Sequence, residues 1–186
     1  MYCDTLPVSA LDERVVAAEA LIDGLMRSDL DLHDHCFATA ILAAQILGTL
    51  GKADDECACG FIVGLLHDVG ITDVGDHGQP SLPSEWLWLQ RRVRRATYKI
   101  VSQVPELAAY ARLAADIHFD SAWSFVSKVV IVADQYDVLT RSWAGEAPQC
   151  SLEEALEVLW RAVGWKYDAR VIGALERICA EQAALP

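Results

Sequence analysis

The chain has 186 residues, the size of a single domain and enough to enclose a hydrophobic core. Hydrophobic residues make up 53% of the chain, which excludes a disordered or fibrous protein. Fifteen basic residues against 27 acidic ones give a formal net charge of −12. This charge argues against nucleic acid or an anionic membrane as the main partner.

Several features together predict a soluble, cytoplasmic protein. The first residues, MYCDTLP, lack the basic and apolar segments of a secretory signal. The longest uncharged stretch, 36–51, is shorter than the roughly 20 apolar residues that span a membrane. The six cysteines show no zinc-binding spacing, so we expect reduced cysteines that mostly pack in the core.

Apolar residues at helical spacing predict helices from the start of the chain. The first prediction is a helix over 11–26, with Ser9 as its N-cap. The second is a helix over 35–50, which Gly51 closes because glycine readily adopts the left-handed conformation that ends helices. The uncharged 36–51 stretch is therefore interpreted as a buried core helix.

A third helix is predicted over 54–69, with Asp54 or Asp55 as its cap. Its large apolar side chains form one stripe. Gly60 and Gly64 fall on a different side of this helix. Because glycine has no side chain, we expect another helix to approach closely there.

The rest of the chain begins with a glycine-containing loop over 70–83. After this loop, the spacing of apolar residues again predicts helices. The valine run at 129–132 could form a strand by itself, but the apolar pattern continues too far without turn signals, which favours a helix. Ser151 and Glu154 have the spacing of a capping box. Helices are expected at 86–104, 106–119, 122–141 and 152–163, and from 167 onwards. The predicted fold is an all-α, single-domain bundle of seven to eight helices, with an N-terminal helix within 1–30 and a core over 31–186.

Histidines and aspartates recur together at or near the ends of the predicted helices. These pairs are Asp31 with His35, His67 with Asp68, and His118 with Asp120. A single pair of this kind is usually a helix cap or a surface pair. Their repetition, in contrast, is compatible with a metal site, because histidine and aspartate together are common ligands for Mn, Fe, Co or Zn.

Asp134 is an acidic residue inside the apolar segment VVIVADQYDVL. A buried carboxylate requires a compensating cation or several hydrogen-bond donors. Asp134 could cap a helix or pair with an arginine, or it could share a metal ion with the histidines.

The order of these residues resembles the HD superfamily of metal-dependent phosphohydrolases, with its pattern H…HD…D. The branch it resembles most is the HD-GYP branch of cyclic di-GMP phosphodiesterases. The resemblance covers nearly all of the chain after Asp31. It rests on the segments HCFATAILAAQILGTLG, GLLHDVG, LPSEWLWLQRRVRRA, VVIVADQYDVLTRS and SLEEALEVLWRAVGWKYDARVIGAL.

This resemblance implies an HD-domain fold and a bound divalent transition metal: Mn, Fe, Co, Ni or Zn. It implies His35, rather than His33, as the first ligand. The residues that match the family's four ligands are His35, His67, Asp68 and Asp134. Asp31 matches the position of a further ligating glutamate, and His118 falls near the first histidine of a paired-histidine motif.

The chain also departs from the HD-GYP pattern. Ile71 stands where the family has a lysine, and Arg92 stands where it has a histidine ligand. Phe119 replaces the second histidine of the pair, and the G-Y-P loop is missing. The resemblance therefore implies that the multi-metal site is reduced to the four-ligand site.

Three functions follow as expectations. The first is a phosphohydrolase acting on a nucleotide or another small phosphate ester, in which Asp68 orients or deprotonates the water and Arg92 binds the phosphate. In the alternative interpretation, Arg92 belongs to a solvated helix face. The second function is a degenerate HD-GYP-like domain that binds a signalling-protein partner. The third is a di-iron oxygenase. The apolar helices are also compatible with a homo-oligomer.

Overall fold

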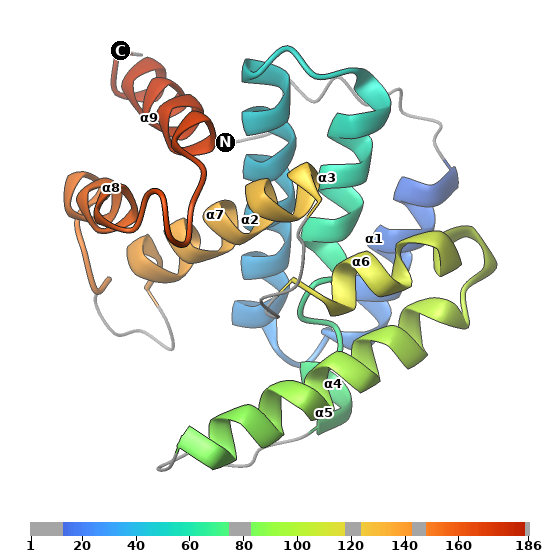
Figure 1. Ribbon diagram of the computed structural model, residues 1–186. Helices are drawn as coiled ribbons and strands as arrows, with labels where there is room; N and C mark the ends of the chain where they lie inside the picture. Colours follow the sequence, from blue (N-terminus) through green and yellow to red (C-terminus); the bar gives the residue numbers. More distant parts are fainter. Residues whose placement is uncertain (1–12, 75–82, 118–123, 143–147, 185–186) are drawn as a thin grey trace.

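The computed structural model describes residues 13–74, 83–117, 124–142 and 148–184. These residues form α-helices and one 3-10 helix, and they contain no β-strand (Figure 1). The predicted all-α bundle is confirmed. The proposed N-cap Ser9 lies outside the described residues.

The first three helices occur where predicted, but the second begins earlier and the third ends at Leu66 instead of at residue 69. They are α1 (Glu13–Leu25), α2 (Leu30–Thr49) and α3 (Asp54–Leu66). Helix α2 begins five residues earlier than predicted, because the Asp29 side chain accepts a hydrogen bond from the Leu32 amide at 3.1 Å. His35 consequently lies in the second turn of α2 and not at its start.

The predicted cap of α3 is wrong. Its N-cap is Ala53, which makes no side-chain capping hydrogen bond. Asp54 and Asp55 are instead in the first turn, where negative charges interact favourably with the helix dipole. Gly51, in contrast, has a φ of 70° and turns the chain between α2 and α3, as predicted.

The middle of the chain contains one long helix and several short ones. These are α4 (Ile71–Val74), α5 (Pro83–Ser102), the 3-10 helix η1 (Pro105–Tyr110) and α6 (Ala111–Ala115). Pro105 ends the long helix as predicted, because proline cannot donate the backbone hydrogen bond that an α-helix needs. Where a single helix was predicted over 106–119, the described residues form η1 followed directly by α6.

The last three helices agree closely with the prediction. They are α7 (Phe125–Thr140), α8 (Leu152–Arg161) and α9 (Ala169–Ala183). The valine run is helical and lies inside α7. The capping box of Ser151 and Glu154 is present at the start of α8.

Helices α2 and α3 lie side by side at the centre of the bundle, and α7 crosses them (Figure 1). Two clusters of buried side chains meet at this central pair. One cluster joins α2 and α3 to α7, α8 and α9. The other joins them to α1, α5, η1 and α6. The five described cysteines are free thiols.

One described segment, Asp54–Val74, is long and apolar enough by composition to cross a membrane. It contains α3, and 72% of its most apolar window is buried inside the protein. Its hydropathy is accounted for by the core that surrounds α3.

The close approach predicted at the glycines of α3 is confirmed. A Cβ atom added to Gly64 would lie 2.6 Å from the Cα of Ala40 on α2. A Cβ added to Gly60 would overlap the Leu47 side chain of the same helix. Since atoms cannot approach so closely, α2 and α3 can pack at this distance only if residue 64 is a glycine.

We predict that Gly64→Ala lowers the free energy of unfolding by about 1–3 kcal/mol, the usual cost of overpacking a core. Denaturant unfolding followed by circular dichroism measures this change. The matched control is Gly173→Ala on α9, where an added Cβ meets no atom within 4 Å. The control should be neutral or stabilising by about 0.4–1 kcal/mol. Equal effects of the two substitutions would contradict the close contact.

Candidate metal centre

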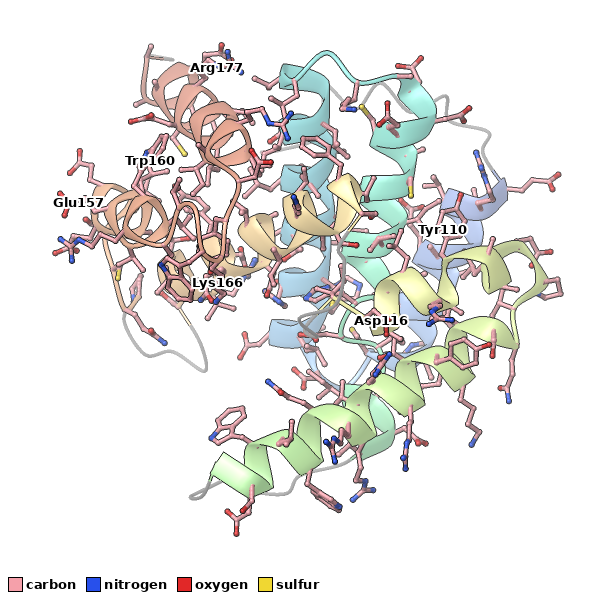
Figure 2. The ribbon with its side chains drawn as sticks, in the orientation of Figure 1. Tyr110, Asp116, Glu157, Trp160, Lys166 and Arg177 are labelled. Carbon is pink, nitrogen blue, oxygen red and sulfur yellow. The ribbon has the colours of Figure 1, made fainter. Side chains whose placement is uncertain are left out.

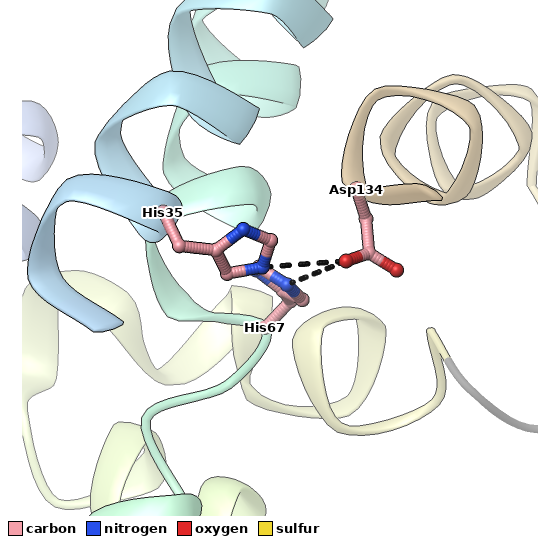
Figure 3. Close-up of side chains that lie close together, drawn as sticks. All are labelled: His35, His67 and Asp134. Atoms are coloured by element: carbon pink, nitrogen blue, oxygen red, sulfur yellow. Dashed lines mark ion pairs between the residues drawn. The ribbon is translucent and has the colours of Figure 1, made fainter. Parts of the chain in front are cut away.

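Three buried side chains from different elements meet at the centre of the bundle. His35 is on α2, His67 directly follows α3, and Asp134 is on α7 (Figure 3). The Oδ1 atom of Asp134 lies 3.3 Å from Nε2 of His35 and 3.6 Å from Nε2 of His67. One ligand atom from each residue falls within 4.8 Å of the other two. This arrangement could hold a metal ion.

Asp68 places a second carboxylate beside the same two imidazoles. Its Oδ2 atom lies 3.4 Å from Nε2 of His67 and 3.8 Å from Nε2 of His35. The four residues that match H…HD…D are thus brought together by three separate parts of the chain.

The centre is buried on its histidine side and slightly open on its carboxylate side. His35 and His67 are each 1% exposed. The side chains of Asp68 and Asp134 are each 13% exposed. A small ligand would therefore reach the centre past the carboxylates.

The His67 ring is oriented by its own helix. Its Nδ1 atom lies 2.7 Å from the Gly64 carbonyl oxygen, which can only accept a hydrogen bond. Nδ1 must therefore carry a proton, and Nε2 is the ring nitrogen that faces Asp68 and Asp134. Metal-binding histidines are commonly held in this way.

Asp137, which the sequence analysis did not identify, orients the His35 ring. The Nδ1 atom of His35 donates to Oδ2 of Asp137 at 2.7 Å. Arg141 donates to both oxygens of the same carboxylate, at 2.7 and 3.0 Å. It also donates to the Asp34 carbonyl oxygen at 3.1 Å, which links the end of α7 to α2.

The sequence shows the spacing of these supporting residues along their helix, but not the contact of Asp137 with His35. Asp137 is three residues after Asp134, and Arg141 is four residues after Asp137. Residues at these spacings lie on one face of a helix. Of the alternatives considered for Asp134, the structure supports its proximity to the two histidines, while the arginine at the end of this helix pairs with Asp137.

The carboxylates around His35 strongly favour its charged form. Burial lowers the pKa of His35, but the hydrogen bonds to Asp134 and Asp137 outweigh burial and raise this pKa to about 9. In the metal-free protein at neutral pH, a proton on His35 thus supplies the positive charge that a metal ion would otherwise bring.

The donor set fits a divalent transition metal. Two imidazole nitrogens and two carboxylate oxygens are ordinary ligands for such ions. Ligands about 2.1 Å from a tetrahedral metal are separated by about 3.4 Å. The four separations between imidazole nitrogens and carboxylate oxygens, 3.3 to 3.8 Å, are close to this value.

Of the other predicted site residues, the structure describes Asp31 and Arg92. Asp31 is exposed in the first turn of α2, one turn before His35, and the structure does not bring it to the two histidines. The guanidinium of Arg92 lies 4.7 Å from the centre of the Trp88 ring on α5. Its role in binding phosphate stays a prediction. His118 lies outside the described residues.

Comparisons with known proteins do not identify a family. No model of a known protein family matches the chain. No curated protein sequence matches it either.

We predict that Asp137→Asn lowers metal affinity about 10- to 100-fold, because it weakens the hydrogen bond that orients His35. Competition with a chromophoric chelator measures this affinity. The matched control is Asp168→Asn, since Asp168 pairs with Arg170 at the start of α9. A control that loses as much affinity as Asp137→Asn would contradict the assigned role of Asp137.

The raised pKa of His35 predicts a specific pH dependence. The pKa is about 9 in the folded, metal-free protein and near 6.5 in the unfolded chain. The resulting stabilisation should be complete below pH 6.5 and should disappear as the pH rises through 9. Urea unfolding in the presence of a chelator, from pH 6 to 9.5, measures it.

The comparison with His35→Gln isolates this effect from that of other titrating groups. The variant should lose the part of the slope that belongs to His35. Metal binding should show the opposite trend, with affinity rising up to tenfold per pH unit until about pH 9, because the metal displaces the His35 proton. Parallel slopes for the variant and the natural chain would contradict this assignment.

Proposed function

We propose that the protein is a metal-dependent phosphohydrolase of the HD type that acts on a nucleotide or another small phosphate ester. The observation that carries the proposal is the convergence of two imidazole Nε2 atoms and two carboxylates in the order H…HD…D. The cofactor is a divalent transition metal, namely Mn, Fe, Co, Ni or Zn.

The metal and the chain have separate tasks in this proposal. When bound, a divalent metal supplies Lewis acidity and lowers the pKa of a coordinated water. His35, His67 and Asp134 hold the ion, with the two rings fixed by Asp137 and the Gly64 carbonyl. Their burial limits access by bulk water, which strengthens electrostatic interactions inside the site.

Asp68 has the position of a proton acceptor. Its carboxylate lies beside both imidazoles and on the partly exposed side of the centre. It can orient the attacking water towards a phosphate and take its proton, a role that carboxylates commonly fill in hydrolases. Arg92 is proposed to bind the phosphate, since guanidinium and phosphate groups form paired hydrogen bonds.

A binding module is the second candidate function. Ile71, where the resemblance implies a lysine, is 38% exposed at the start of α4. An apolar side chain there supplies no charge to a phosphate during transfer, which favours a domain that binds a ligand or a signalling partner without turnover. The di-iron alternative requires further ligands. Within the described ranges, one group of potential ligands is found.

Metal analysis and turnover test the proposal together. The purified protein, loaded with each candidate metal and desalted, should retain close to one ion per chain by mass spectrometry. His67→Ala should abolish this retention. The matched control is His33→Ala, because His33 pairs with Asp23 and Asp34 on the surface and should leave metal content unchanged.

The metal-loaded protein should hydrolyse bis(p-nitrophenyl) phosphate or p-nitrophenyl phosphate. Asp68→Asn should lower kcat by at least about 100-fold, the usual contribution of a general base, while Asp73→Asn on the exposed side of α4 should not. Metal retention without turnover of these esters or of a nucleotide panel would favour the binding module. No retention of any metal would overturn both the metal centre and the enzyme.

A further inference from the structure

A cavity lies between α5 and the segment formed by η1 and α6. It has a volume of about 740 Å³. None of the four residues of the candidate metal centre lines it. We call it the α5–α6 groove.

One wall of the groove is a stripe along α5. Arg91, Arg94 and Arg95 contribute guanidinium groups to it, and Leu87 and Tyr98 lie at its two ends. Arg91 is four positions after Leu87, and Arg94 and Arg95 each lie three or four positions from both Arg91 and Tyr98, so the five residues share one face of the helix. Tyr98 is 52% exposed, which leaves its ring accessible to a ligand.

The opposite wall is formed by Ala108 on η1 and by Arg112 and Ala115 on α6. The two alanines have short side chains, and this leaves the space between the helices open. Arg112 adds a fourth guanidinium to the groove, and its side chain is 84% exposed.

Asp116 is the one acidic residue that lines the groove, and it anchors the two walls to each other. It follows α6 and faces α5 (Figure 2). Its Oδ1 atom accepts from Arg94 at 2.6 and 2.7 Å, and its Oδ2 atom lies 3.6 Å from Nε of Arg112. This carboxylate fixes the Arg94 side chain across the groove.

Asp116 does not compensate the positive charges of Arg91 and Arg95. Within the described residues, neither has a carboxylate partner within ion-pair distance. They are four positions apart, a spacing at which like charges destabilise a helix. A positive cluster of this kind is unexpected in a chain with a net charge of −12, where acidic partners are abundant.

We propose that the α5–α6 groove binds a soluble compound with two or more adjacent phosphates, such as a nucleoside polyphosphate. Guanidinium groups match phosphate oxygens in paired, charge-assisted hydrogen bonds. Four arginines against one aspartate leave an excess of three positive charges, which suits a polyphosphate better than a single phosphate. Tyr98 offers an accessible aromatic surface to a base.

The shape of the groove favours a free compound over a lipid headgroup. The arginines line a cavity of about 740 Å³ between two helical walls, which has room for the phosphates and the base of a free compound together. The site is also independent of the proposed hydrolase function, since its lining residues exclude His35, His67, Asp68 and Asp134. It would remain if the metal centre proved to be empty or inactive.

Calorimetric titration tests the proposal with two probes, inorganic triphosphate and ATP. The measurements use the full chain in chelator and are repeated on His67→Ala, so that the metal centre cannot contribute. Both probes should bind both proteins. The double variant Arg91→Gln/Arg95→Gln should weaken binding of each probe at least about tenfold, since hydrogen bonds between charged groups are lost.

The matched control is Arg161→Gln/Arg177→Gln, which removes the same charge from α8 and α9. Arg177 lies on the opposite side of the molecule from α5 (Figure 2). The control should change the affinity by less than about twofold if binding is local rather than a general charge effect. Thermal melts of both double variants verify that they fold.

Tyr98→Ala distinguishes a nucleotide from a bare polyphosphate. It should weaken ATP about fivefold or more, the usual effect of losing base stacking, and leave triphosphate unchanged. Equal loss of both probes would overturn the base contact. Equal weakening by the two arginine double variants, or binding to anionic phospholipid vesicles without binding of either soluble probe, would overturn the proposal.

Discussion

The close packing of α2 on α3 fixes the geometry of the candidate metal centre. Gly64 contributes to this geometry twice. Its missing side chain allows the backbone of Ala40 to approach, and its carbonyl oxygen holds the ring of His67. His35, on the facing helix, is thereby placed within reach of the same carboxylates. A wider separation of the two helices would increase the distance between the His35 and His67 rings. Gly64 therefore determines both the packing of the helices and the positions of the candidate ligands.

Charge compensation explains the rest of the centre. Asp68, Asp134 and Asp137 place three carboxylates around His35, and Arg141 supplies a permanent positive charge to Asp137. The remaining demand is met by a proton on the imidazole or by a metal ion. Both occupy the same side of the ring, and for this reason the proton and the metal compete. The proton therefore stabilises the metal-free site, and a metal ion can still bind by displacing it.

The sequence predicted the fold class, the helices and the meeting of His35, His67, Asp68 and Asp134, because helical periodicity and the H…HD…D order are local or motif-level signals. It failed at helix ends and wherever tertiary contacts decide. The true start of α2 is set by a local cap, Asp29, that apolar spacing does not reveal, and a 3-10 helix begins at Pro105 where an α-helix was expected to follow. The role of Asp137 depends on a hydrogen bond to a residue 102 positions away, which no local pattern encodes. The α5–α6 groove requires two helices to be placed together, whereas the sequence showed only a basic helix face.

The uneven distribution of charge over the molecule has a consequence for the rates at which ligands arrive. Helix α5 carries five of the fifteen basic residues and only one acidic residue, while acidic residues dominate the remainder. The long-range field thus repels an approaching anion over most of the surface and attracts it near α5. Electrostatic steering of this kind directs diffusional encounters and weakens as salt screens the field. Added salt would therefore slow the arrival of phosphates at α5 and ease their approach elsewhere on the molecule.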